Sequence, residues 1–246
     1  MSLGLAGAVW AYFHLKETKK PALHAIDVLP DGALCVISSN NFNDLANKLT
    51  NQNLIWQELI NISEFKKINQ QLHFFDSIIT ETESLKDFFK ERSVFLAVYP
   101  QKENASVLIA FNLRDEAQQE DFLKEITAAL RTTVTPTGDC EFRTGNATYF
   151  LTVKRGVVVI ANDKKNIENA FLESSQKEIA NKSFATLKKL LEKEKLCNIF
   201  LNHNLQSKSI FSHAIFSGQS VYDVEFNPDD ITFNGFNTPD SNSVLN

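Results

Sequence analysis

One pair of carboxylates whose spacing could support acid–base chemistry lies in an alternating stretch near the C-terminus. Asp223 and Glu225 are two residues apart, so both carboxyl groups share one face of the expected strand, where a covering cleft would let them act as general acid and base. Tyr222, Val224 and Phe226 fill the opposite face. This pattern is typical of an antiparallel sheet with one solvated face. We therefore favour solvated carboxylates over a catalytic pair.

The positions of the cysteines and histidines do not indicate a metal site or a reactive thiol. Cys197, His203 and His213 are ligand types that zinc accepts, but their intervals match no compact zinc pattern and no fourth ligand accompanies them. Cys35 and Cys140, like Cys197, lie within or beside apolar segments. We expect three buried thiols and no disulfide framework.

Other catalytic and nucleotide-binding motifs are missing from the sequence. There is no Gly-x-Ser-x-Gly elbow, and the 8 glycines are too scattered to form a phosphate-binding loop or a dinucleotide fingerprint. The basic residues are dispersed and form no stripe for nucleic acid. We predict a non-enzymatic protein with no metal, no cofactor and no nucleic-acid partner.

The elements expected in the first half are a strand, a helical region and a hairpin. Residues 33–37 form a short apolar run that leads into a helical stretch over 42–89. The apolar positions along this stretch advance by three and four residues: Phe65, Ile68, Leu72, Phe75 and Ile79. This spacing predicts a buried helix face. The alternative is an apolar groove, lined by Phe65, Leu72 and Phe75, that binds a lipid or a similar ligand.

Strands dominate the expectations for the rest of the chain. Predicted hairpins cover 94–111, 147–161 and 221–236, with a helix over 115–131, a short strand at 140–143 and a strand at 196–201. A Phe-Leu-Leu spacing at 42–49 recurs at 184–190, so a strand-helices-strands unit could be duplicated. We predict an α+β fold, with antiparallel sheets packed against helices in two lobes that divide near 132–146.

The N-terminus carries an unbroken apolar run, Leu3 to Leu15, which we interpret as a truncated transmembrane anchor. As a helix it spans about 20 Å, short of the roughly 30 Å of bilayer hydrocarbon. A buried helix and a signal-peptide core are the alternatives. The residues expected in the membrane are Leu5, Val9, Trp10, Tyr12 and Phe13.

Domain boundaries and orientation follow from the flanks of this run. Residues 1–20 comprise the anchor and its basic flank, residues 21–246 the folded domain, and residues 237–246 a loose polar tail. Lys16, Lys19 and Lys20 favour a cytosolic domain, whereas a more basic natural start would place it outside. Both orientations stay open.

Several of these features together resemble a group of bacterial envelope proteins. They are the anchor, Pro21, the strand at 33–37, Phe42-x-x-Leu45, Trp56-x-x-Leu59 and the hairpin from Ser93 to Phe111. The group consists of uncharacterised membrane-anchored proteins classed under a domain of unknown function. The resemblance implies an extracytoplasmic domain on a longer chain and assigns no catalytic residues.

Composition fits an ordinary globular domain, with 43% hydrophobic residues, 22% charged residues and a net charge of -5. We predict a non-catalytic binding or scaffolding module that meets a protein or cell-wall partner through a sheet edge or the groove between lobes. A carrier of a lipid or other apolar ligand is the first alternative. An enzyme whose site no motif reveals is the second.

Overall fold

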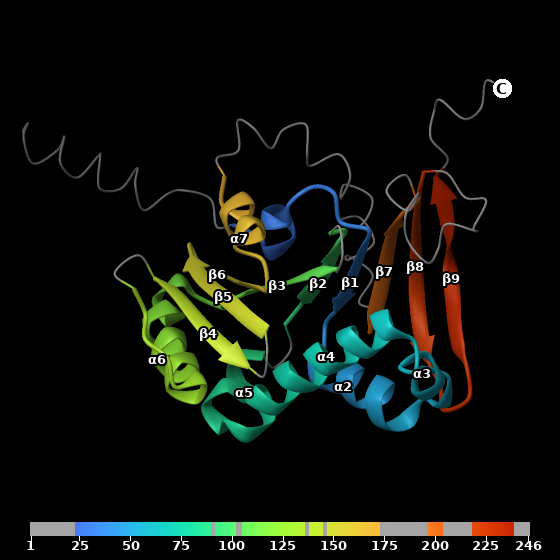
Figure 1. Ribbon diagram of the computed structural model, residues 1–246, viewed down its shortest axis with the longest axis horizontal. Coiled ribbons are helices and arrows are strands. Elements are labelled where there is room, and N and C mark those ends of the chain that lie inside the picture. Colours follow the sequence, from blue (N-terminus) through green and yellow to red (C-terminus); the bar gives the residue numbers. More distant parts are fainter. Residues whose placement is uncertain are drawn as a thin grey trace, which may run out of the picture.

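A computed structural model describes residues 23–89, 92–101, 105–135, 138–144, 147–172, 196–203 and 218–238. Within them, nine strands form one antiparallel sheet with the order β4-β5-β6-β3-β2-β1-β7-β8-β9 (Figure 1). The strands are β1 (Cys35–Ser39), β2 (Val94–Tyr99), β3 (Ser106–Asn112), β4 (Asp139–Thr144), β5 (Ala147–Lys154), β6 (Val157–Ala161), β7 (Cys197–Asn202), β8 (Gln219–Phe226) and β9 (Ile231–Thr238).

The strand order places the first three strands in the middle of the sheet. β4, β5 and β6 extend it on one side, and β7, β8 and β9 extend it on the other. Strands on both sides of the expected division at 132–146 therefore belong to a single sheet. The α+β class, with antiparallel strands packed against helices, is confirmed.

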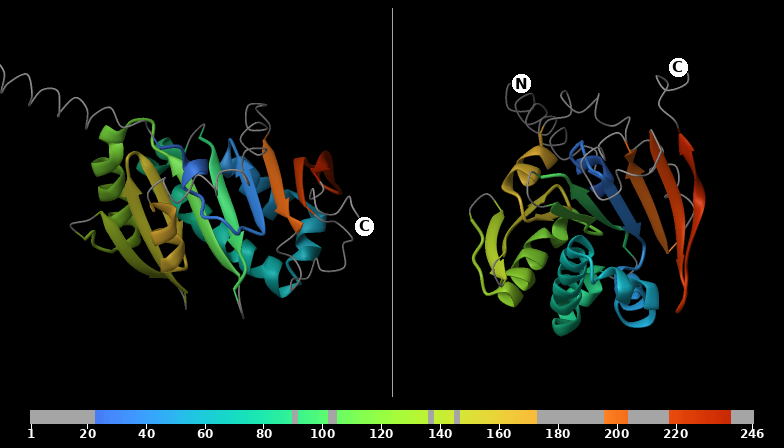
Figure 2. Two further views of the ribbon diagram at one scale, coloured as in Figure 1. Left: turned by 90° about the horizontal axis from the view of Figure 1, so that it is seen from above. Right: turned by 45° about the vertical axis from the view of Figure 1, so that its right-hand side comes forward.

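Helices cover one face of the sheet, which arches over them (Figure 2). Their apolar side chains form the larger core with that face of the strands. These helical segments are α2 (Phe42–Asn47), the π-helical turn η2 (Lys48–Gln52), α3 (Leu54–Leu59), α4 (Ser63–Glu81), α5 (Glu83–Phe89), the 3-10 turn η3 (Glu116–Gln118) and α6 (Gln119–Leu130).

Local sequence explains where these helices begin and which side they bury. The Asn41 side chain accepts a hydrogen bond from the backbone N–H of Asp44, which caps α2. In α4, Leu72, Phe75 and Ile79 are buried at helical spacing. The predicted apolar stripe is therefore an inner helix face.

The opposite face of the sheet packs against the 3-10 turn η1 (Ala25–Val28) and α7 (Lys164–Ala170), which lie above the central strands in Figure 1. Because both faces are covered here, β2 is buried at every position and β3 at every position except Asn112. This explains their continuous apolar runs.

Several sequence predictions are confirmed at the level of elements. The hairpins β2–β3, β5–β6 and β8–β9 occur as expected. β9 continues through Thr238, so Asn237 belongs to the sheet and not to a loose tail. Within the described residues no helix has the length and apolarity needed to cross a bilayer. The expected anchor residues, and the recurring Phe-Leu-Leu spacing at 184–190, lie outside the described residues.

Candidate functional site at the β9 edge

β9 is one of the two edges of the sheet, and no strand of the described ranges pairs with its outer side. Residues 232–237 are all exposed, including Phe233 at 53% and Phe236 at 45%. Its eight residues pair with β8 in one continuous register and include no charged residue and no proline. Charges, prolines and bulges are the usual means by which a sheet edge avoids pairing with other chains.

A buried asparagine holds the turn that precedes β9. Asn53 is 1% exposed, and its side-chain oxygen accepts from the Trp56 N–H at 2.7 Å, which caps α3. Its Nδ2 donates to the carbonyl oxygens of Asn227 and Asp230, at 2.6 and 2.9 Å. One side chain thus begins α3 and fixes the β8–β9 turn against it.

A second polar contact holds the far end of β9. Ser220 Oγ donates to Asn237 Oδ1 at 3.3 Å and lies 2.6 Å from His203 Nε2. The two contacts link the start of β8 to a residue of β9 and to the residue that follows β7.

The middle of β9 depends on a glycine. An added Cβ at Gly235 would overlap the Val221 carbonyl oxygen and come within 2.8 Å of the Tyr222 Cα. Tyr222 is the cross-strand partner of Gly235, and its ring meets that of Phe233 edge to face at 5.9 Å between centroids. Glycine thus allows the two backbones to approach and Tyr222 to lie beside Phe233.

The hydrogen-bonding pattern determines which backbone groups of β9 remain available. The Asn227 N–H donates to the Asp230 carbonyl, which makes these residues a hydrogen-bonded pair. Such pairs alternate along an antiparallel ladder, so Thr232, Asn234 and Phe236 bond to β8. The backbone N–H and C=O groups of the alternate residues point away from the sheet: Ile231, Phe233, Gly235 and Asn237.

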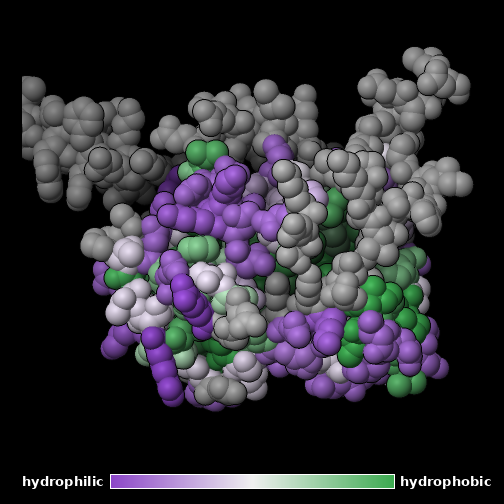
Figure 3. Space-filling view, viewed as in Figure 1, coloured by the Kyte–Doolittle hydropathy of each residue, from purple (hydrophilic) through white to green (hydrophobic). Residues whose placement is uncertain are grey.

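Apolar side chains accompany these outward groups. Phe233 lies on the helix side of the sheet, where Tyr222 and Phe226 are partly buried. Leu54, whose N–H donates to the Pro228 carbonyl of the adjoining turn, is 65% exposed. Hydrophobic surface is visible on the side of the molecule that carries β8 and β9 (Figure 3). An incoming strand would therefore meet both unpaired backbone groups and apolar contacts.

The carboxyl pair singled out in the sequence does not lie at an edge, because β8 sits between β7 and β9. Glu225 is exposed and Asp223 is partly buried opposite Asn198 of β7. One oxygen of Asp223 and the amide oxygen of Asn198 are buried without a hydrogen-bond partner. Asp223 is thus less solvated than its alternation pattern predicts.

The possible metal ligands do not converge. Cys197 and His203 stand at opposite ends of β7, about 20 Å apart along an extended strand, and His213 lies outside the described residues. No group of three or more His, Cys, Asp or Glu side chains in the described segments could hold a metal ion.

The three cysteines have free thiols; Cys140 and Cys197 are buried as expected, whereas Cys35 is only partly buried. Burial raises the pKa of Cys35 to about 12 and also raises the pKa values of Cys140 and Cys197. Thiols in such surroundings stay protonated near neutral pH and are poor nucleophiles.

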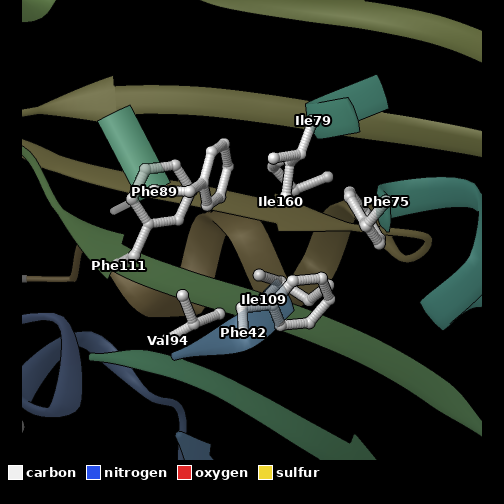
Figure 4. Close-up of a pocket in the computed structure, with 8 residues that line it drawn as sticks. All are labelled: Phe42, Phe75, Ile79, Phe89, Val94, Ile109, Phe111 and Ile160. Carbon is white, nitrogen blue, oxygen red and sulfur yellow. The ribbon is translucent and has the colours of Figure 1, made fainter. Parts of the chain in front are cut away.

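Two of the three residues of the predicted apolar groove are packed in the core. Leu72 and Phe75 are buried in the core, whereas the side chain of Phe65 lies outside the described part of α4. A pocket beside Phe75 leaves about 10 Å³ for a water-sized sphere, and Figure 4 shows its lining of Phe42, Phe75, Ile79, Phe89, Val94, Ile109, Phe111 and Ile160. That volume is about that of one water, far below a lipid chain.

The sequence predicted the β8–β9 hairpin and a partner at a sheet edge, but it did not show that β9 is that edge. Only the absence of charge and proline from 231–238 pointed to an edge able to pair. Nothing in the local sequence marked Asn53 or Ser220, because both act on residues far along the chain.

Comparisons with known proteins give no family. No protein-family model and no curated protein matches the chain. Among solved structures the chain is similar to TP0453 in its crystal form III, with a TM-score of 0.40 and 9% identity, over 87% of this chain and 79% of that one. Similarity at this level supports no argument about function.

Proposed function

We propose that this chain is a non-catalytic binding module of a membrane-anchored bacterial envelope protein, and that it binds a partner protein by adding one of the partner's strands to β9. The observation that carries the proposal is the open, uncharged edge with outward backbone groups at four alternate positions, Ile231 to Asn237. Strand addition uses such groups for affinity and the flanking side chains for selectivity.

Contacts that position both ends of β9 support this function. Asn53 fixes one end of β9, Ser220 contacts the other, and Gly235 allows close pairing in the middle. A strand held in its binding conformation loses less entropy when a partner binds. Attachment to the membrane by residues 3–15, with the domain on the extracytoplasmic side, is the part of this proposal that rests on sequence alone.

Amide hydrogen exchange with a designed peptide tests the proposal. The peptide alternates Val and Thr and matches the eight residues of β9. If strand addition occurs, the peptide binds saturably and slows exchange at the outward amides of Phe233 and Gly235. If no such peptide changes exchange along β9, the edge does not pair and the proposal fails.

Two substitutions at one position separate backbone from side-chain effects. Phe233→Pro removes an outward N–H that β8 does not use, while Phe233→Ala removes the ring and keeps the N–H. We expect Phe233→Pro to abolish peptide protection at Gly235 and Phe233→Ala to weaken it. Equal binding by both variants would show that the peptide binds elsewhere. Circular dichroism of both variants checks that they fold.

A further inference from the structure

We infer that the partner strand is basic at the end that lies beside the β8–β9 turn and apolar where it faces Phe233. This inference rests on the proposed function. Its first observation is charge: residues 218–238 contain four acidic side chains and no lysine or arginine. The acidic residues are Asp223, Glu225, Asp229 and Asp230.

Of these four acidic residues, the two in the β8–β9 turn are placed best to attract a basic side chain of an added strand. Asp229 and Asp230 are both exposed. The Asp230 carboxylate accepts from Asn227 Nδ2 at 2.8 Å and from Thr232 Oγ1 at 3.3 Å, which holds it at the start of β9. An added strand lies about 4.8 Å from β9. Its terminal side chains would then lie within about one Debye length, roughly 8 Å, of these carboxylates.

We take the added strand to be antiparallel, because every strand pair in this sheet is antiparallel. In an antiparallel addition, the residue opposite Ile231 is near the C-terminal end of the partner strand. Lysine or arginine at that end would approach Asp229 and Asp230, and an apolar residue further back would cover Phe233. A second copy of this chain fits less well, because β9 offers no cationic side chain to the acidic turn.

Three peptides of equal length test the inference by the same exchange measurement. All alternate Val and Thr, and they end in two Lys, two Thr or two Glu residues. We expect the lysine peptide to bind about threefold to tenfold more tightly than the threonine peptide at low salt, because exposed ion pairs are individually weak. This advantage should disappear at high salt. A fourth peptide with its lysines at the N-terminal end should lose most of the advantage.

Charge variants show whether the turn is responsible. Asp229→Asn should reduce the advantage of the lysine peptide, whereas Asp121→Asn, on α6 beside the other end of the sheet, makes the same charge change and should not. Equal reductions would mean that only the net charge attracts the peptide, which would overturn the inference.

The remaining outcomes separate this inference from the proposed function. If all peptides protect Phe233 and Gly235 equally, the edge pairs without charge preference, and only the inference fails. If none protects them, the proposed function fails first. A dimer of the chain that Phe233→Pro dissociates in sedimentation would show that a second copy occupies the edge, which also overturns the inference.

Discussion

The two edges of the sheet treat their free backbone groups differently. Outside β4, the N–H of Thr135 donates to the Asp139 carbonyl at 2.7 Å, and Thr132 Oγ1 donates to the Glu141 carbonyl at 2.8 Å. β4 also alternates charged with buried residues, whereas β9 has no charged residue and exposes two phenylalanines. Among the residues that the structure describes, β4 therefore carries protection against strand addition that β9 lacks.

This difference matters because an unprotected edge strand increases the risk of aggregation. An open strand with exposed aromatic residues exposes a protein to aggregation. The same chain covers β4 with backbone and side-chain contacts, which shows that its fold can protect an edge strand. The exposed β9 edge is the surface that we propose binds a partner strand.

Substitution of Gly235 should have the largest effect on the comparison. Gly235→Ala forces a Cβ into the Val221 carbonyl, so β9 must separate from β8 around this position. We expect a loss of about 3 kcal/mol in the free energy of unfolding, the upper range for overpacking, together with fast exchange along β9. Urea unfolding and amide exchange measure the two effects.

Gly138 at the start of β4 is the matched control. It adopts a φ of +81°, and an added Cβ would meet only the Val153 carbonyl at 3.6 Å. Gly138→Ala therefore costs only the left-handed backbone conformation, about 1 kcal/mol. If both substitutions destabilised equally, close approach of the β8 and β9 backbones would not be what Gly235 provides.

Removal of Asn53 should have the next largest effect. Asn53→Ala loses the cap of α3 and leaves the Asn227 and Asp230 carbonyls without their donor, at a cost of about 2 kcal/mol. Asn53→Ser keeps a capping oxygen but cannot reach the turn. If the serine variant restored full stability and slow exchange at the turn, the contact with the hairpin would be unimportant.

A smaller effect is expected at the protected edge. Thr132→Val removes the hydrogen bond to the Glu141 carbonyl, which costs about 1 kcal/mol and opens β4. Exchange should accelerate in β4 and stay unchanged in β9. Equal exchange in the variant and the parent would show that Thr132 does not cover the edge.

Raising the pH above 9 should destabilise the centre of the sheet. No effect on either edge is expected at neutral pH. Burial raises the pKa of Cys35 from 9.0 to about 12, so this thiol stabilises the fold fully below pH 9. As pH rises toward 12 the unfolded chain loses its proton first, and stability falls. Urea unfolding between pH 8 and pH 11 measures the slope. Cys35→Ala should reduce the slope of the free energy of unfolding against pH. An unchanged slope would show that other groups cause the pH dependence.

Much of the fold could be predicted because its signals are local. Alternation in 221–226 and the turn Asn227-Pro228-Asp229-Asp230 indicated a hairpin, and the stripe through Leu72 and Phe75 indicated a helix face. The strand order could not be predicted. β1 lies between β2 and β7 through pairings that no local pattern encodes.

The candidate site depended on that missing information. Whether β9 is an edge follows only from the order of the whole sheet. The same order shows that Asp223 and Glu225 lie on an inner strand, β8, which their alternation in the sequence could not reveal. Asn53 acts on residues 227 and 230, far along the chain. Contacts of this kind leave no spacing to recognise, so the sequence predicted the hairpin but not its position at the edge of the sheet.

The most direct test is the exchange rate of each amide along β9, with and without the neutral Val–Thr peptide. The account predicts alternation in the free chain, with slow exchange at Thr232, Asn234 and Phe236 and fast exchange at Phe233 and Gly235, and slow exchange throughout once the peptide binds. Uniformly slow exchange before peptide is added would show that the edge is already covered and would contradict the account.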